Sequence, residues 1–200
     1  MKRSRTRTIV SIAVLGALAG VLMFIKFPIP IAPSFYKLEF SDTAALIGGF
    51  AMGPLAAVLI CFIKNLINVI LEGTTTAFVG EISNFIMSCA LCATAAFIYK
   101  KEHTKKGAIK AMAISVIVLA VVSAIINYAV VIPAYVRFMG FPLEAIIGMG
   151  AKIFPIIDSL FKLVLLCTVP FNLIKGIAVS LITFVLYKRI SPLINGKSEQ

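Results

Sequence analysis

Long apolar runs separated by short polar clusters dominate the chain. Four of these runs, residues 8–25, 82–99, 109–131 and 171–187, are each close to the roughly 20 apolar residues that a helix needs to cross a bilayer. Their polar positions are few and do not alternate with a period of two, so they predict helices rather than strands. The pattern therefore predicts an all-α integral membrane protein.

The apolar stretch 42–72 decides how many times the chain crosses the membrane, because it is long for one span and short for two. The basic clusters "KRSRTR", "YKKEHTKK" and "YKR" should all face the cytoplasm. A single span would place the second cluster outside. A turn at Gly53-Pro54, with proline at a helix start, places all three inside. We therefore predict six transmembrane helices with cytoplasmic N- and C-termini.

This topology predicts two long outer loops, after helices one and five. The first, 26–40, contains three prolines and several aromatic residues, so we expect it to be extended and to fold back over the protein. The second, 139–168, holds Lys152, Asp158 and Lys162, which argue against a seventh span. We expect a helix at the outer surface there. The sequence leaves the structure of residues 145–167 undecided.

Composition supports a membrane protein and excludes other classes. The chain is 60% hydrophobic and 14% charged, with a mean hydropathy of +1.05. The net charge of +11 lies in clusters beside apolar runs, which indicates topology signals rather than nucleic-acid binding. The first residues also fit a signal peptide, but the apolar run continues and further spans follow, so we expect a retained first span. Residues 1–200 are predicted to form a single transmembrane domain.

The residues that usually carry catalysis or metal binding are sparse. All four cysteines lie inside apolar stretches, so we expect no disulfide framework. Cys89 and Cys92 form C-x-x-C, but no second ligand pair or histidine lies near them in sequence, which favours small packing residues over a metal site. The only histidine, His103, lies in a basic loop. We predict no enzyme activity, no metal and no cofactor.

Four polar residues are expected at a similar depth. With a helical rise of about 1.5 Å per residue, Glu81, Asn127, Asn172 and Lys175 fall about 20–28 Å above the inner basic residues of their helices. Polar groups at such depths face protein or a cavity. Interhelical hydrogen bonding is a competing explanation, especially for the buried asparagines. Convergence beneath an aromatic loop favours an outward-facing pocket for a small polar and aromatic molecule.

The chain shows no energy source for active transport. It has no nucleotide-binding motif with the required glycine spacing, no line of carboxylates through the membrane and no evident inverted repeat. Ala13 and Ala17 lie four residues apart on the first span, where small side chains allow another helix to approach closely. The pair fits either internal packing or docking onto a membrane subunit that supplies energy.

Several segments resemble the substrate-binding (S) subunits of energy-coupling factor (ECF) vitamin transporters, specifically the riboflavin-specific members. They are "FPIPIAPSFYKLEFSDTAALIGGFAMGP", "FIKNLINVILEG", "VGEISNF", "INYAVVIPAY" with "RFMGFP", and "PFNLIKG". The resemblance implies a six-helix subunit of the bacterial cell membrane that captures riboflavin from outside, with flavin mononucleotide (FMN) as an alternative ligand. It also implies docking through Ala13 and Ala17 onto a transmembrane coupling subunit with two ATPases.

The resemblance further implies that residues matching Glu81, Asn127, Asn172 and Lys175 hold the flavin beneath a lid. Amide side chains can match the alternating carbonyl and N–H groups of the flavin edge. The lid side chains Phe35, Tyr36, Leu38 and Phe40 are expected to cover the ring. Three alternatives stay open: an S subunit for another vitamin such as thiamine or biotin, an intramembrane enzyme, and a structural membrane protein without a ligand.

Overall fold

The computed structural model describes residues 5–195, with side chains described up to residue 186. The first half contains α1 (Arg5–Met23), β1 (Phe27–Pro28), β2 (Lys37–Leu38), α2 (Asp42–Met52), α3 (Pro54–Glu72) and α4 (Val79–Tyr99). The second half contains α5 (Lys105–Ile126), η1 (Asn127–Val131), α6 (Ile132–Met139), α7 (Leu143–Ala151), α8 (Leu160–Leu163), η2 (Val164–Thr168) and α9 (Val169–Asn195), where η denotes a π-helical segment.

Five of the described helices are long and apolar enough to cross a membrane. They are Arg5–Met23, Pro54–Glu72, Val79–Tyr99, Lys105–Met139 and Leu160–Leu186. One further apolar helix in the described part of the chain, α2, has only 11 residues, nine of which are buried. The all-helical prediction is confirmed, and α2 is the short helix expected before Gly53.

The turn between α2 and α3 forms where glycine and proline predicted it. Gly53 has φ +97°, a left-handed conformation that is strained for residues with a Cβ, and its N–H bonds the Gly49 carbonyl at 2.8 Å to close α2. Pro54 starts α3, where its missing N–H has no helical partner to lose. The 42–72 stretch is therefore two antiparallel helices.

The last two spans are longer than the sequence predicted. The fifth predicted span, residues 109–131, is part of a helix that continues from α5 through η1 and α6 to Met139. It ends eight residues beyond the predicted end at 131. The sixth predicted span starts at Leu160, whereas the apolar run predicts a start at residue 171. Lys162 lies in the first turn of this helix and forms an i,i+4 ion pair with exposed Asp158. The two charges that argued against a span therefore lie at the end of the helix. Between these spans, α7 is too short to cross a bilayer.

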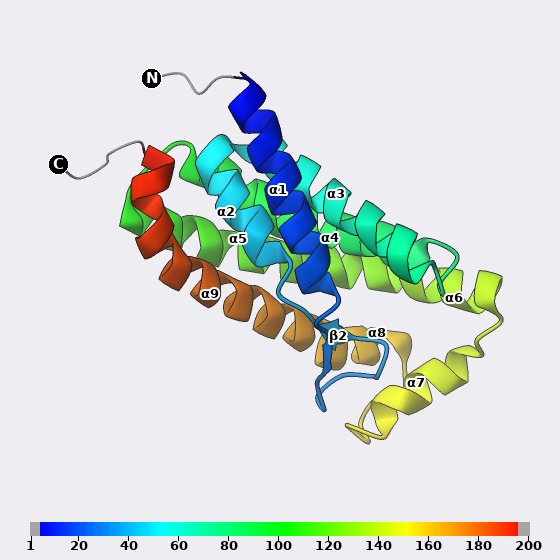
Figure 1. The fold of residues 1–200 in the computed structure, drawn as a ribbon. Helices are drawn as coiled ribbons and strands as arrows, with labels where there is room; N and C mark the ends of the chain where they lie inside the picture. The colour runs from blue at the N-terminus through cyan, green and yellow to red at the C-terminus, as the bar shows by residue number, and fades with distance from the viewer. Residues whose placement is uncertain (1–4, 196–200) are drawn as a thin grey trace.

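Both ends of the bundle are clearly defined in Figure 1. The start of α1, the end of α9 and the α4–α5 turn lie at one end, whereas the β1–β2 hairpin and α7 lie at the other. The described helix ends next to the three basic clusters therefore gather at the same end, as the predicted topology requires. This arrangement places the loop after α1 and the segment after α6 together at the opposite end.

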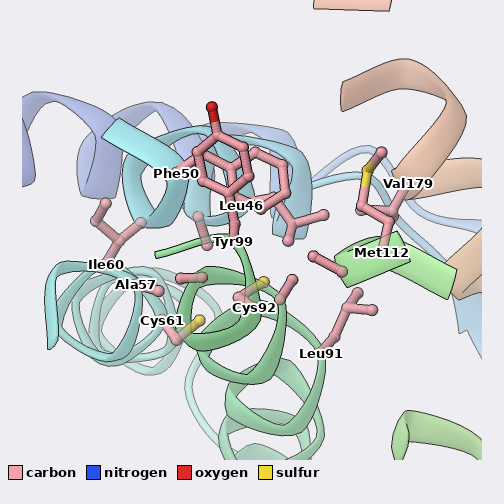
Figure 2. Close-up of a cluster of buried hydrophobic side chains, with 14 of the residues drawn as sticks. Leu46, Phe50, Ala57, Ile60, Cys61, Leu91, Cys92, Tyr99, Met112 and Val179 are labelled. Carbon is pink, nitrogen blue, oxygen red and sulfur yellow. The ribbon is translucent and has the colours of Figure 1, made fainter. Parts of the chain in front are cut away.

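Two hydrophobic clusters hold the bundle. The larger one lies among α2, α3, α4, α5 and α9 and includes Leu46, Ile60, Leu91 and Tyr99, all at most 1% exposed (Figure 2). On its edge, α1 packs closely on α3 because Gly16 and Gly20 face it. A Cβ at Gly16 would lie 2.6 Å from the Ile63 side chain, so only glycine permits this approach.

The second cluster fixes the loop after α1 to the other end of the bundle. Ala32 and Tyr36 of the loop are buried against Ile132, Ile146, Leu163, Val164, Cys167 and Phe171. The loop pairs with itself through the two-residue strands β1 and β2, in which Phe27 faces Leu38. The predicted fold-back of this loop over the protein is confirmed.

Candidate functional site

A cavity of about 150 Å³ lies between this loop and the helices below it. Its lining comes from the loop, from α4, from η1 and α6, and from α9: Phe35, Tyr36, Lys37, Glu39, Gly80, Ser83, Asn84, Met87, Asn127, Val131, Tyr135, Phe171, Asn172 and Lys175. The cavity therefore joins segments separated by more than a hundred residues.

Two π-helical segments lie beside the cavity. Asn127 begins η1 and Thr168 ends η2, four residues before Asn172. A π-bulge inserts one extra residue in a helical turn and rotates the following side chains, and such bulges are frequent at functional sites. Each asparagine is also anchored to its own helix. The Asn127 amide donates to the Ser123 carbonyl at 2.8 Å, and the Asn172 amide donates to the Thr168 carbonyl at 3.0 Å.

The two asparagine oxygens differ in their partners. Asn127 Oδ1 accepts a hydrogen bond from the Tyr36 hydroxyl at 3.0 Å. Asn172 Oδ1 has no hydrogen-bond partner among the residues that the structure describes, although the side chain as a whole is only 3% exposed. Asn172 lines the cavity, so this oxygen borders the space that a ligand would occupy. Asn172 is therefore ready to accept a hydrogen bond from a ligand.

Tyr36 fills the space above these amides. Its ring lies 4.5 Å from the Phe35 ring and 5.2 Å from the Phe171 ring, and its hydroxyl lies 2.7 Å from Thr168 Oγ1. Burial raises the pKa of the Tyr36 hydroxyl well above its usual range, although the Thr168 hydrogen bond opposes the shift. Tyr36 is thus a neutral side chain. Its ring and hydroxyl make aromatic contacts and hydrogen bonds of the kind that a bound ligand would make.

A cluster of four buried charges adjoins the cavity. Lys175 Nζ lies 2.6 Å from Glu39 and 3.2 Å from Asp42, while Lys64 Nζ lies 2.5 Å from Asp42 and 3.8 Å from Glu39. Lys64 also donates to Ser41 Oγ at 2.7 Å. Two ammonium groups and two carboxylates sum to zero charge, which makes their burial tolerable.

The charge cluster ties the loop to the bundle. Burial alone would raise the pKa of Glu39, but the ammonium groups of Lys175 and Lys64 outweigh it and hold that pKa below its usual range. Glu39 lies on the loop, whereas its two lysines lie on α9 and α3. Its carboxylate is therefore charged when the loop is closed and anchors the loop to two helices.

Five of the eight predicted ligand-binding residues line the cavity together: Phe35, Tyr36, Asn127, Asn172 and Lys175. The other three do not. Glu81 accepts a hydrogen bond from Thr76 at 2.7 Å, and Phe40 packs against the large core cluster and the Phe27 ring. Leu38 lies in β2, paired with Phe27.

The structure also adds residues that sequence analysis missed. Glu39, Ser83 and Met87 line the cavity, and Asp42 joins the charge cluster. Asn84 lines the cavity as well. The available signal was charge balance, because two lysines inside spans require carboxylate partners and Glu39 and Asp42 are the nearest acids preceding α3.

The predicted docking residues lie on the outer surface of the bundle. Ala13 and Ala17 of α1 are exposed, while Gly16 and Gly20 of the same helix face α3. The first span therefore divides its small residues between two faces. Gly16 and Gly20 serve internal packing, and the Ala13–Ala17 face is free for another helix in the described part of the chain.

A helical bundle with apolar spans, and with a cavity near one end that is lined by amide, charged and aromatic side chains, defines a membrane-embedded binding protein. Residues 7–187 match the family described as ECF transporter, substrate-specific component. The chain belongs to this family of membrane proteins.

Similar proteins cover nearly the whole chain. It is 33% identical over 191 residues to "Riboflavin transporter RibU" of Staphylococcus aureus (strain TCH60), covering 96% of this chain and 94% of that protein. It is 29% identical over 190 residues to "Riboflavin transporter FmnP" of Bacillus subtilis (strain 168), covering 94% of each. A solved structure described as "Structure and mechanism of the S component of a bacterial ECF transporter" superposes with a TM-score of 0.76 at 32% identity, covering 96% of this chain and 99% of that chain.

Proposed function

We propose that this protein is a riboflavin-binding S component, which captures riboflavin outside the cell and delivers it inward with energy from partner subunits. The observation that carries the proposal is the cavity in which Asn127, Asn172 and Lys175 meet beside the aromatic rings of Tyr36 and Phe171. The names of the relatives in Staphylococcus aureus and Bacillus subtilis support riboflavin as the ligand.

The chemistry of the cavity suits a flavin. The pyrimidine edge of the flavin ring alternates carbonyls with an N–H group, and an asparagine offers both an acceptor and donors. The Asn172 oxygen would accept from the ring N–H, and Asn127 would offer its oxygen once Tyr36 leaves. Lys175 has only donors, so it would bind a carbonyl or a ribityl hydroxyl. The rings of Phe35, Tyr36 and Phe171 would cover the apolar part of the ligand.

The loop must move before a flavin can enter. A cavity of about 150 Å³ is smaller than the roughly 300–1,000 Å³ typical of pockets for small organic ligands. The Tyr36 ring fills the missing space and its hydroxyl holds two groups of the site. We infer that the loop of residues 26–41 swings outward with Tyr36, admits the flavin and closes over it. Glu81 and Leu38 would then contact the ligand only after this rearrangement.

The orientation in the membrane follows from the basic clusters. We propose six transmembrane helices, counting the short α2, with both termini and the α4–α5 turn in the cytoplasm. The hairpin and the cavity then lie near the outer surface. Docking of the exposed Ala13–Ala17 face on a transmembrane coupling subunit that carries two ATPases would provide the energy for import.

A flavin titration tests the proposal. Riboflavin fluorescence is measured while purified protein in detergent is added, in parallel with FMN, and thiamine and biotin are tested as competitors. We expect saturable quenching by riboflavin that neither thiamine nor biotin reverses. Absence of quenching at micromolar riboflavin would reject the proposal, and displacement by thiamine or biotin would assign the protein to another vitamin.

A further inference from the structure

Three cysteines gather in the larger hydrophobic cluster, outside the ligand cavity. Cys89 and Cys92 lie one helical turn apart on α4, and Cys61 lies on the neighbouring helix α3. Figure 2 shows Cys61 of α3 and Cys92 of α4 within this cluster. Cys61 and Cys92 are buried, whereas Cys89 is partly exposed.

A carboxylate joins these thiols from a third helix. The ligating atoms of Asp42, Cys61 and Cys92 all lie within 4.8 Å of one another, and the Cys92 thiol donates to the Asp42 carbonyl at 3.6 Å. Ligands about 2.3 Å from a tetrahedral Zn²⁺ ion are about 3.8 Å apart. A contraction of about 1 Å would therefore bring the group to metal-binding distance, with Cys89 available as a fourth ligand.

Charge balance favours a divalent ion. Lys64, Lys175, Glu39 and Asp42 already sum to zero charge around Asp42. A divalent ion that replaces the two thiol protons of Cys61 and Cys92 adds two positive and two negative charges, and the protons leave to solvent. The buried cluster then stays neutral, which a low-dielectric interior requires.

We propose that Cys61, Cys92 and Asp42, with Cys89, form a binding site for a thiophilic divalent metal ion of the Zn²⁺ class. Thiolates select soft and borderline metals, and no hard-ion alternative matches two sulfur ligands. The partly exposed Cys89 is the point of entry. The ion links α2, α3 and α4, so its main effect is to stabilise the bundle, independently of what the ligand cavity binds.

Cadmium titration tests this site because cadmium–thiolate bonds absorb in the ultraviolet. The full chain is purified in detergent under a metal-free reductant that keeps all thiols reduced, and the charge-transfer absorption is followed during addition of Cd²⁺. We expect one Cd²⁺ per chain, displaceable by Zn²⁺, and a rise in melting temperature on binding. C61S and C92A should each lower the affinity at least tenfold.

Cys167 provides the matched control. It is buried but lies in η2, in the other hydrophobic cluster, so C167S should bind Cd²⁺ like the wild type. Absence of the absorption band in wild-type protein that elutes as a folded, monodisperse species would overturn the proposal. So would wild-type affinity in both C61S and C92A. Neither result bears on riboflavin binding, which the flavin titration measures separately.

Discussion

At the scale of single residues, Tyr36 controls whether the cavity is free. Its hydroxyl bonds Thr168 and Asn127, the second of which the proposed ligand needs, and its ring contacts those of Phe35 and Phe171. A ligand therefore competes with this side chain. The affinity of the protein reflects the difference between two sets of contacts rather than the ligand's contacts alone.

Removing the Tyr36 hydroxyl should strengthen riboflavin binding. Y36F keeps the ring but loses two hydrogen bonds of the closed loop, worth about 0.5–1.5 kcal/mol each, so we expect a dissociation constant about 5- to 150-fold lower in the fluorescence titration. Y128F removes a hydroxyl from η1 at a residue that is 49% exposed, and it should leave the affinity unchanged. Weaker binding by Y36F would mean that the hydroxyl contacts the ligand instead.

Glu39 should make stability fall at acidic pH. Because its pKa is lower in the folded protein than in the unfolded chain, its contribution is complete above the ordinary glutamate value of about 4.3. That contribution is lost as the pH drops through the lower, folded pKa. We expect the melting temperature of the wild type to fall below about pH 4.3, and E39Q to show a weaker dependence.

The same variant should also destabilise the protein at neutral pH. E39Q leaves two buried lysines with one carboxylate, a change that typically costs about 3–5 kcal/mol for a buried ion pair. E144Q, at an exposed position on α7, is the matched control and should melt like the wild type. An E39Q protein with wild-type melting temperature and wild-type pH dependence would contradict the charge cluster.

At the scale of elements, α1 has one face that packs inside the bundle and another face that we propose docks on a partner subunit. Replacing exposed Ala13 and Ala17 together with leucine should abolish riboflavin uptake by cells, because bulky side chains prevent close helix approach, while binding by the purified subunit stays within about twofold. G16L is the contrasting variant, because it overpacks the α1–α3 contact and should lower the melting temperature, with a cost of about 1–3 kcal/mol. Normal uptake by the A13L/A17L variant would remove the docking role.

The elements also explain what the sequence could and could not predict. Gly53 and Pro54 have local conformational preferences, so the α2–α3 turn was predictable. The helical rise alone was enough to predict that Asn127, Asn172 and Lys175 lie together. Glu39 and Asp42 were missed because their pairing with Lys64 and Lys175 depends on how the loop after α1 closes. The approach of Cys61 to Cys92 likewise depends on the packing of α3 against α4.

The ends of the long spans were predicted too short for a related reason. Lys162 and Asp158 made the residues before 171 look like a surface loop, but a helix that extends to the membrane surface carries such charges on its terminal turn. Residues 132–139 continue their helix past the π-helical η1, a feature without a clear sequence signal. These extensions place Tyr135 in the cavity lining and Thr168 next to the Tyr36 hydroxyl.

At the scale of the whole molecule, the hairpin and the α4–α5 turn lie at opposite ends of the bundle (Figure 1). We expect a membrane-impermeant maleimide to label S34C in intact bacteria and to label K106C only after the cells are opened, since both positions are exposed and the parent chain gives the background. Labelling of K106C from outside would reverse the orientation and place the cavity at the inner surface.

The central claim is that the cavity beneath Tyr36 is the riboflavin site, and Asn172 tests it most directly. In the fluorescence titration, N172L should bind riboflavin about 5- to 150-fold more weakly, which corresponds to about 1–3 kcal/mol for a lost buried hydrogen bond. N65L, which removes a buried asparagine of α3 that does not line the cavity, should retain wild-type affinity. Wild-type affinity in a folded N172L protein would contradict the claim.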